Sequence, residues 1–146
     1  MEWKKEKEYT IIAGCGRLGS TIAGKLSDQK KDVLILDSDK SAFRKLPASY
    51  GGLTMTAGAT DVEKLEAAGI KGAGVFIAVT DDDNVNLCAA QMARKIYRIP
   101  KVVARIYDDE KSILLENMGV DTICPSELSE KEITYYINGG GKKYAQ

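Results

Sequence analysis

Short apolar runs recur along the chain, separated by longer segments in which apolar and polar residues mix. Most of the runs are rich in Val, Ile and Leu, and they cover residues 9–13, 33–36, 53–56, 75–79, 101–106 and 120–124. Continuous apolar runs of this length are typical of strands that are covered on both faces of a sheet. The pattern therefore predicts six strands, of which 75–79 and 101–106 are expected to be covered on both faces.

The mixed segments carry apolar residues at helical spacing. They predict helices over residues 20–27, 40–46, 60–69 and 109–118, a long helix that residues 80–83 cap and that runs to about Tyr97, and a further amphipathic helix within 126–138. We expect Thr60 to cap the third of these helices, because Glu63 follows it as an acid at the third helical position. Strands that alternate with helices in this way pair in parallel through right-handed crossovers. The chain is thus predicted to be an α/β protein with a Rossmann-like, doubly wound parallel sheet of order 3-2-1-4-5-6 and a C-terminal crossover helix.

A glycine-rich turn joins the first predicted strand to the first predicted helix. Its glycines have the spacing G-x-G-x-x-G, in which the first allows a tight turn and the second lets a pyrophosphate approach the backbone. The third lets the helix pack closely on the strand, and the free N–H groups at the helix start then face the anion. The predicted phosphate cradle comprises Gly14, Cys15, Gly16, Arg17, Leu18 and Gly19.

An acidic residue, Asp37, ends the second predicted strand and is followed by Ser38 and Asp39. A carboxylate at this position meets the ribose hydroxyls of an adenosine. We expect discrimination against NADPH, because a 2′-phosphate would meet carboxylates with no arginine immediately following. The turn, Asp37 and Ser38 together predict a nucleotide site, against the alternative of packing glycines and one surface aspartate.

One domain is the expected organisation, since 146 residues suit a single core. Its expected parts are an N-terminal extension (1–7), a Rossmann-type nucleotide-binding domain (8–125), a C-terminal helix (126–138) and a flexible tail (139–146). The 21 basic and 21 acidic residues cancel, so charge gives no reason to expect a nucleic-acid partner. No apolar run approaches the ~20 residues that span a bilayer, and a cytoplasmic protein is expected.

Residue types that support catalysis are scarce. Histidine is absent, which removes the side chain most often used for acid/base work near neutral pH. No Walker-type lysine follows the glycines, so the turn lacks the parts for phosphoryl transfer. Cys15, Cys88 and Cys124 are odd in number and widely spaced, which favours neither a disulfide framework nor a zinc site. We therefore expect no catalytic residue and no bound metal.

Taken in order, the glycine turn, Asp37 and the stretches 59–61, 79–87 and 103–106 resemble the N-terminal RCK domain. That family comprises nucleotide-binding regulatory subunits of Trk/Ktr-type potassium uptake systems and gating domains of some potassium channels. The resemblance covers residues 7–137. It implies binding of NAD(H) or another adenine nucleotide (ATP, ADP or AMP), a homodimer or higher homo-oligomer, and peripheral association with a membrane potassium-transporter subunit.

The resemblance also implies roles for single residues. Arg17 would reach the diphosphate or a terminal phosphate, and Thr80 would lie at the crevice between the sheet halves. Arg105 would reach phosphate or a neighbouring subunit, with a structural ion pair as the open alternative. Glu127 matches an acidic position that some members use near the subunit interface.

Two features depart from the family pattern. Residues 57–60 read Ala-Gly-Ala-Thr where many relatives read Gly-Asp-Ala-Thr, so the carboxylate that can contact the adenine edge is missing. Family members also usually continue into a C-terminal RCK domain. A one-domain member and an N-terminal piece of a longer protein are both compatible with the sequence.

Three functions are weighed on these grounds. The favoured one is a non-catalytic sensor in which adenine nucleotide occupancy biases the shape of a dimer or ring, and the ring gates a potassium transporter. A minimal NAD-dependent oxidoreductase is the alternative, although it needs a proton donor and a substrate pocket. A redox switch on Cys15 is the third, because a helix N-terminus can lower the pKa of a thiol. The helix within 126–138 is expected to pack against a second copy, since its Tyr and Ile side chains would otherwise be exposed.

Overall fold

The computed structural model of the chain describes residues 9–141. Its six strands are β1 (Thr10–Ala13), β2 (Val33–Asp37), β3 (Leu53–Thr56), β4 (Val75–Ala78), β5 (Lys101–Arg105) and β6 (Asp121–Ile123). They form one sheet of order β3-β2-β1-β4-β5-β6, in which all neighbours are parallel. The predicted fold class and strand order are confirmed.

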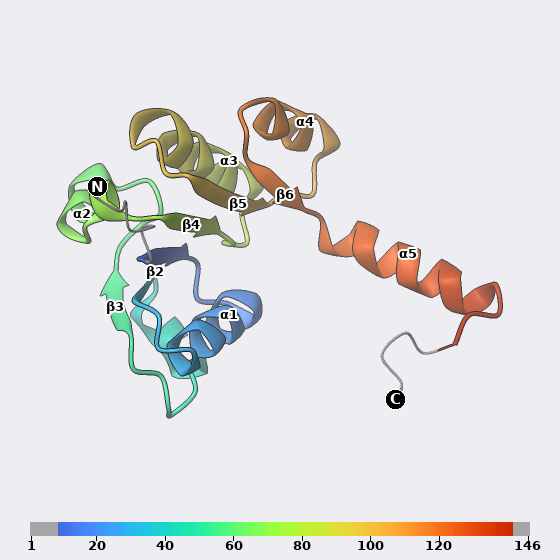
Figure 1. Ribbon diagram of the computed structural model, residues 1–146, viewed down its shortest axis with the longest axis horizontal. Coiled ribbons are helices and arrows are strands. Elements are labelled where there is room, and N and C mark those ends of the chain that lie inside the picture. The colour runs from blue at the N-terminus through green and yellow to red at the C-terminus, as the bar shows by residue number, and fades with distance from the viewer. Residues whose placement is uncertain (1–8, 142–146) are drawn as a thin grey trace, which may run out of the picture.

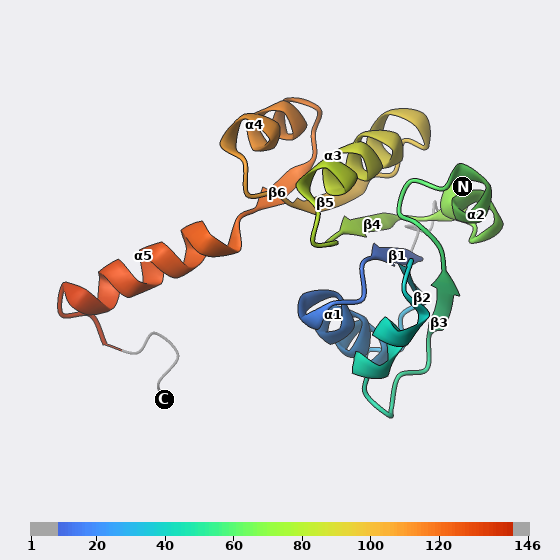
Figure 2. The ribbon, with the colours of Figure 1, turned by 180° about the vertical axis from the view of Figure 1, so that it is seen from behind.

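Helices cover both faces of this sheet. They are α1 (Arg17–Asp28), the 3₁₀-helix η1 (Lys40–Lys45), α2 (Val62–Ala67), the 3₁₀-helix η2 (Ile70–Gly72), α3 (Asp83–Gln91), the π-helical turn η3 (Met92–Ile96), α4 (Asp109–Asn117) and α5 (Pro125–Ile137). Figures 1 and 2 show α1 on one side of the sheet and α3 and α4 on the other. No helix among residues 9–141 is long and apolar enough to cross a membrane.

The core is divided by the sheet into two clusters. Neighbouring residues of β1 point to opposite faces, as the two-residue period of a strand requires. Ile11 packs in the cluster under α2, α3 and α4, whereas Ile12 packs in the cluster under α1 and η1. Both side chains are fully buried. This burial on each face explains the continuous apolar runs of the central strands. The edge strand β3 is mostly exposed, and Leu53 is 65% exposed.

Aspartate side chains cap α2 and α3. Asp61, not Thr60, caps α2, because its carboxylate accepts a hydrogen bond from the Lys64 N–H at 3.2 Å. The long helix that residues 80–83 are expected to cap has Asp82 as its N-cap, and it changes from α to π geometry at Met92. The carboxylate of Asp82 accepts from two N–H groups of the first turn of α3, which sets its start.

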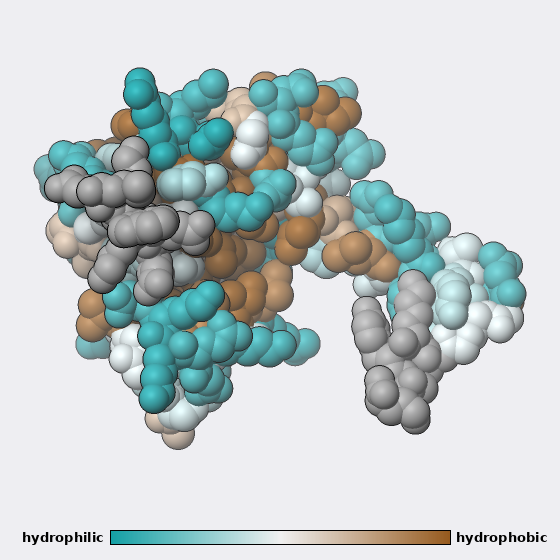
Figure 3. All heavy atoms as spheres, viewed as in Figure 1, coloured by the Kyte–Doolittle hydropathy of each residue, from teal (hydrophilic) through white to brown (hydrophobic). Residues whose placement is uncertain are grey.

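The last helix, α5, stands apart from the two layers (Figures 1 and 2). None of its residues is buried, and Leu128, Ile133 and Ile137 are among its exposed apolar side chains. Figure 3 shows the helix clear of the main body, with apolar surface near its start. The expected N-terminal extension (1–7) and residues 142–146 of the expected flexible tail lie outside the described residues.

Candidate functional site

A cavity of about 550 Å³ lies at the carboxyl ends of β1, β2, β4 and β5. This is the point at which the strand order reverses, since β1 lies between β2 and β4. Ligands of open α/β sheets bind in the crevice at this point. Most of the predicted site residues line the wall, namely Gly14, Cys15, Gly16, Asp37, Ser38, Thr80 and Arg105.

The three glycines of the turn have different surroundings. Gly14 has a φ of +111°, and a Cβ there would lie 2.7 Å from the Val79 carbonyl oxygen, so the close approach of β1 to the end of β4 requires glycine. A Cβ on Gly19 would overlap the Gly14 carbonyl oxygen, which explains the tight packing of α1 against the turn. Gly16 has no atom within 4 Å of its would-be Cβ. The wall is therefore open at Gly16.

The start of α1, beside this open space, has no side-chain cap among the described residues. Gly16 is the N-cap of the helix and offers no side chain to its first N–H groups. Such N–H groups, aligned with the helix dipole, attract anions. Arg17 and Leu18 of the predicted cradle do not line the cavity. Arg17 is exposed outside the wall, and Leu18 packs in the core cluster under α1.

The Asp37 carboxylate is fixed by backbone donors. One oxygen accepts from the Cys15 N–H at 2.9 Å and the other from the Asp39 N–H at 2.8 Å. A carboxylate has about four acceptor sites, so lone pairs remain for further donors. The end of β2 thus offers a preorganised acceptor of hydroxyl groups to the cavity.

The surroundings of the Cys15 side chain do not favour a reactive thiol. It is fully buried, and its thiol donates to the Ala42 carbonyl at 3.4 Å. Burial, and after it the Asp37 carboxylate, raise the pKa of the Cys15 thiol above its usual value. A redox switch needs a lowered thiol pKa, so the prediction of such a switch on Cys15 is wrong.

The opposite wall is held by a buried amide, Asn86, which is 1% exposed. Its Oδ1 accepts from the Thr80 N–H at 2.9 Å and from the Thr80 hydroxyl at 2.6 Å. Its Nδ2 donates to the carbonyls of Thr80 at 3.0 Å and Arg105 at 2.9 Å. All four hydrogen-bonding positions of the amide are used, and they tie the end of β4 to the end of β5.

The Arg105 guanidinium lies across the same two strand ends. Its Nη2 donates to the carbonyls of Val79 at 3.1 Å and Thr80 at 2.8 Å. No ion pair of Arg105 is found among residues 9–141. Its Nε is buried without a hydrogen-bond partner in the described part of the chain. An unpaired buried donor costs about 1–3 kcal/mol, which an oxygen of a ligand would offset.

A second carboxylate holds the loop beyond β5. Asp83, the first residue of α3, accepts from the Tyr107 N–H at 3.0 Å and the Asp108 N–H at 2.9 Å. The loop between β5 and α4 is thus attached to the first turn of α3, as the amide of Asn86 attaches the strand end before it.

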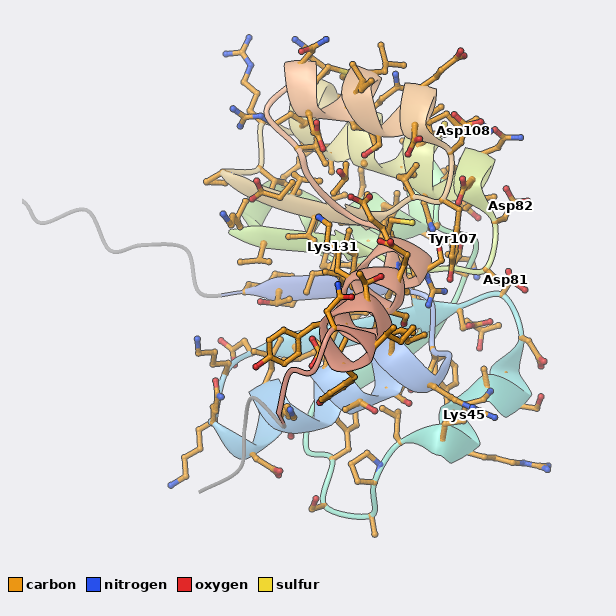
Figure 4. The ribbon with its side chains drawn as sticks, turned by 90° about the vertical axis from the view of Figure 1, so that its right-hand side faces the viewer. Lys45, Asp81, Asp82, Tyr107, Asp108 and Lys131 are labelled. Carbon is orange, nitrogen blue, oxygen red and sulfur yellow. The ribbon has the colours of Figure 1, made fainter. Side chains whose placement is uncertain are left out.

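Sequence reasoning missed two residues of this region. Lys45, at the end of η1, lines the cavity, and Figure 4 shows it at the same edge of the molecule as Asp81 and Asp82. Its ammonium weakens the argument against a 2′-phosphate, which assumed no nearby cation. Asn86 lies in the stretch 79–87, which carries the resemblance. A polar residue on an apolar helix face is the sequence signal for its role.

The wall also includes residues 57–60, among them Gly58, which has open space beside it. Among residues 9–141, no group of three or more His, Cys, Asp or Glu side chains is arranged to hold a metal ion. The cavity therefore combines an anion-attracting helix start, a fixed carboxylate and a partly unpaired guanidinium.

Comparison with known proteins gives consistent results. The family model of the TrkA-N domain matches residues 10–125. The Trk system potassium uptake protein TrkA of Streptomyces coelicolor is 39% identical over 116 residues, which are 80% of this chain and 52% of that protein. A TrkA homolog of Methanothermobacter thermautotrophicus is 30% identical over 119 residues, 82% of this chain and 55% of that protein. The chain spans about half the length of these curated relatives.

A solved structure with a similar fold is the Kef CTD of Shewanella denitrificans in an AMP-bound form. It is 26% identical to this chain, with a TM-score of 0.75, and the match covers 91% of this chain and 83% of that one.

Proposed function

The chain belongs to the TrkA-N domain family, and from this premise we propose that it is the nucleotide-binding regulatory part of a Trk/Ktr-type potassium uptake system. Its ligand is NAD(H) or another adenine nucleotide (ATP, ADP or AMP), and the proposed site is the cavity at the strand reversal. One observation carries the proposal: the open space at Gly16 lies across the turn from a carboxylate, Asp37, that backbone N–H groups hold in place.

Each part of a nucleotide has a counterpart in the wall. The phosphates lie over the turn, where Gly16 leaves room and the first N–H groups of α1 attract an anion. The adenosine ribose donates its hydroxyls to Asp37, next to Ser38. Arg105 offers its unpaired Nε, and Thr80 lines the crevice between the sheet halves. The AMP-bound Kef CTD supports an adenine nucleotide as the ligand class.

The proposed nucleotide regulates the protein without being chemically converted. In the proposed mechanism no group transfers hydride or phosphate, and the nucleotide acts only through its different affinities for two arrangements of the protein. The names of the TrkA relatives support a membrane potassium-transporter subunit as the partner. In the same proposal, the protein is cytoplasmic and peripherally associated with that subunit.

A second copy of the chain is the proposed partner of α5. Ile137 is 77% exposed and Leu128 is 59% exposed, so the helix offers apolar surface that its own domain leaves in water. Glu127, the acid proposed near the subunit interface, pairs with Lys131 one turn later at 3.3 Å. Figure 4 labels Lys131 on α5, which points toward the viewer. Packing of two such helices would give at least a homodimer.

The proposal is tested by a thermal-shift panel with NADH, NAD, ATP, ADP and AMP. A nucleotide present at about 100 times its Kd stabilises a protein by about 2.7 kcal/mol, which we expect to raise the Tm by about 5–10 °C. Chromatography should recover the nucleotide intact after hours, and light scattering at tens of micromolar protein should give at least a dimer. No shift with any nucleotide, or steady oxidation or hydrolysis of the bound one, would contradict the proposal.

A further inference from the structure

We propose that Asn86 is a positioning residue of the nucleotide site, because it fixes the carboxyl ends of β4 and β5 and through them the guanidinium of Arg105. This inference rests on the proposed function. Asn86 itself is not part of the cavity wall. Its effect on a nucleotide would therefore be transmitted by Arg105.

The surroundings of Asn86 show what its amide is used for. The side chain projects from the buried face of α3, where the next buried positions are Ala89 and Ala90. A buried amide in such a place is costly unless every polar atom finds a partner. None of its partners belongs to α3: all four bonds go to Thr80 and Arg105. The amide thus contributes to the geometry of the strand ends and not to the helix.

The hydrogen bonds converge on one carbonyl. The Thr80 oxygen accepts from Asn86 Nδ2 at 3.0 Å and from Arg105 Nη2 at 2.8 Å. Asn86 also binds the carbonyl of Arg105 itself, at 2.9 Å. The amide therefore holds both the main chain that carries the guanidinium and the oxygen to which the guanidinium binds.

The guanidinium transmits this constraint to the cavity. Its donors form a rigid planar fork, so the position of Nη2 determines the position of Nε. Nε is the buried donor without a partner among the described residues. A nucleotide oxygen that binds Nε would depend on Asn86 without touching it.

The test is a double-mutant cycle read by titration with AMP. Asn86→Asp keeps the shape but replaces both donors by an oxygen that faces two carbonyls. Asn84→Asp is the matched control, because it makes the same charge change two residues earlier, at an exposed position of the same helix. We expect Asn86→Asp to weaken AMP binding about tenfold, and Asn84→Asp to change it less than about twofold.

The second arm of the cycle uses Arg105→Met. If Asn86 acts through Arg105, the double variant binds AMP no more weakly than Arg105→Met alone. A merely structural amide would instead give losses that multiply. If the carboxylate prevents folding, as judged by circular dichroism, Asn86→Ala takes its place in the same cycle.

The outcomes separate this inference from the proposed function. A wild-type chain that binds AMP, with an Asn86→Asp variant of equal affinity or with multiplying losses, would overturn the role of Asn86 and leave the proposed function standing. A wild-type chain that binds none of NADH, NAD, ATP, ADP and AMP would overturn the proposed function, and this inference with it.

Discussion

The two walls of the cavity are built on different principles. On the β1–β2 side the geometry comes from backbone: Gly14 brings the strand end against β4, Gly16 leaves space, and N–H groups hold Asp37. On the β4–β5 side it comes from side chains, chiefly Asn86 and Arg105. The first wall tolerates no added atom where chains approach, whereas the second tolerates no lost polar group. We therefore expect added atoms to damage the first wall and removed polar groups to damage the second.

The largest effect is expected when an atom is added to the backbone-built wall. Gly14→Ala places a Cβ 2.7 Å from the Val79 carbonyl at a φ of +111°, and we expect it to destabilise the fold by about 3 kcal/mol. Gly16→Ala is the control, because open space surrounds its Cβ and it should cost less than about 1 kcal/mol. Urea denaturation measures both, and equal losses would remove the distinction between the two glycines.

A smaller effect is expected when a side-chain acceptor next to the side-chain-built wall is removed. Asp83→Ala deprives the N–H groups of Tyr107 and Asp108 of their acceptor, at a cost of about 1 kcal/mol, since water can reach them. Asp81→Ala, two residues earlier, removes an exposed carboxylate for which no hydrogen bond or ion pair is found in the described part, and should cost less than about 0.5 kcal/mol. Chemical denaturation of the two variants compares them. If Asp81→Ala proved the more damaging, the assigned role of Asp83 would be wrong.

The third expected difference concerns the reactivity of the cysteine in the backbone-built wall and not the stability of the fold. Burial and the neighbouring Asp37 raise the pKa of Cys15, so its thiol should resist iodoacetamide at pH 8. Cys88 is exposed, and we expect it to be alkylated on the order of 100-fold faster. Peptide mass spectrometry over time gives both rates. Labelling of Cys15 at the rate of Cys88 would revive the redox switch.

The same division explains how much the sequence predicts. Continuous apolar runs such as 75–79 predict buried parallel strands, and all six strands and their order are confirmed. The glycine turn is also predictable, because glycines at fixed spacing mark the positions where the turn leaves no room for a side chain. Where two neighbouring residues compete for a cap, as Thr60 and Asp61 do at α2, the sequence does not decide between them.

The side-chain-built wall is harder to predict. Asn86 meets Thr80 and Arg105 only because the sheet brings together residues 6 and 19 positions away. Lys45 reaches the cavity because η1 turns back toward the end of β2, a path that its own sequence does not specify. Such contacts depend on the folded sheet edge, so a linear motif does not contain them.

The most direct test of the nucleotide site is calorimetric titration of AMP and NADH into the wild type, Gly16→Val and Gly72→Val. Gly72 also has no atom within 4 Å of its would-be Cβ but lies outside the cavity, which makes it the matched control. We expect Gly72→Val to bind as the wild type does. Gly16→Val should lose about 100-fold or more in affinity, because the branched side chain fills the space of the phosphates, with stability within about 1 kcal/mol of wild type. Unchanged affinity in a folded Gly16→Val variant would contradict the site.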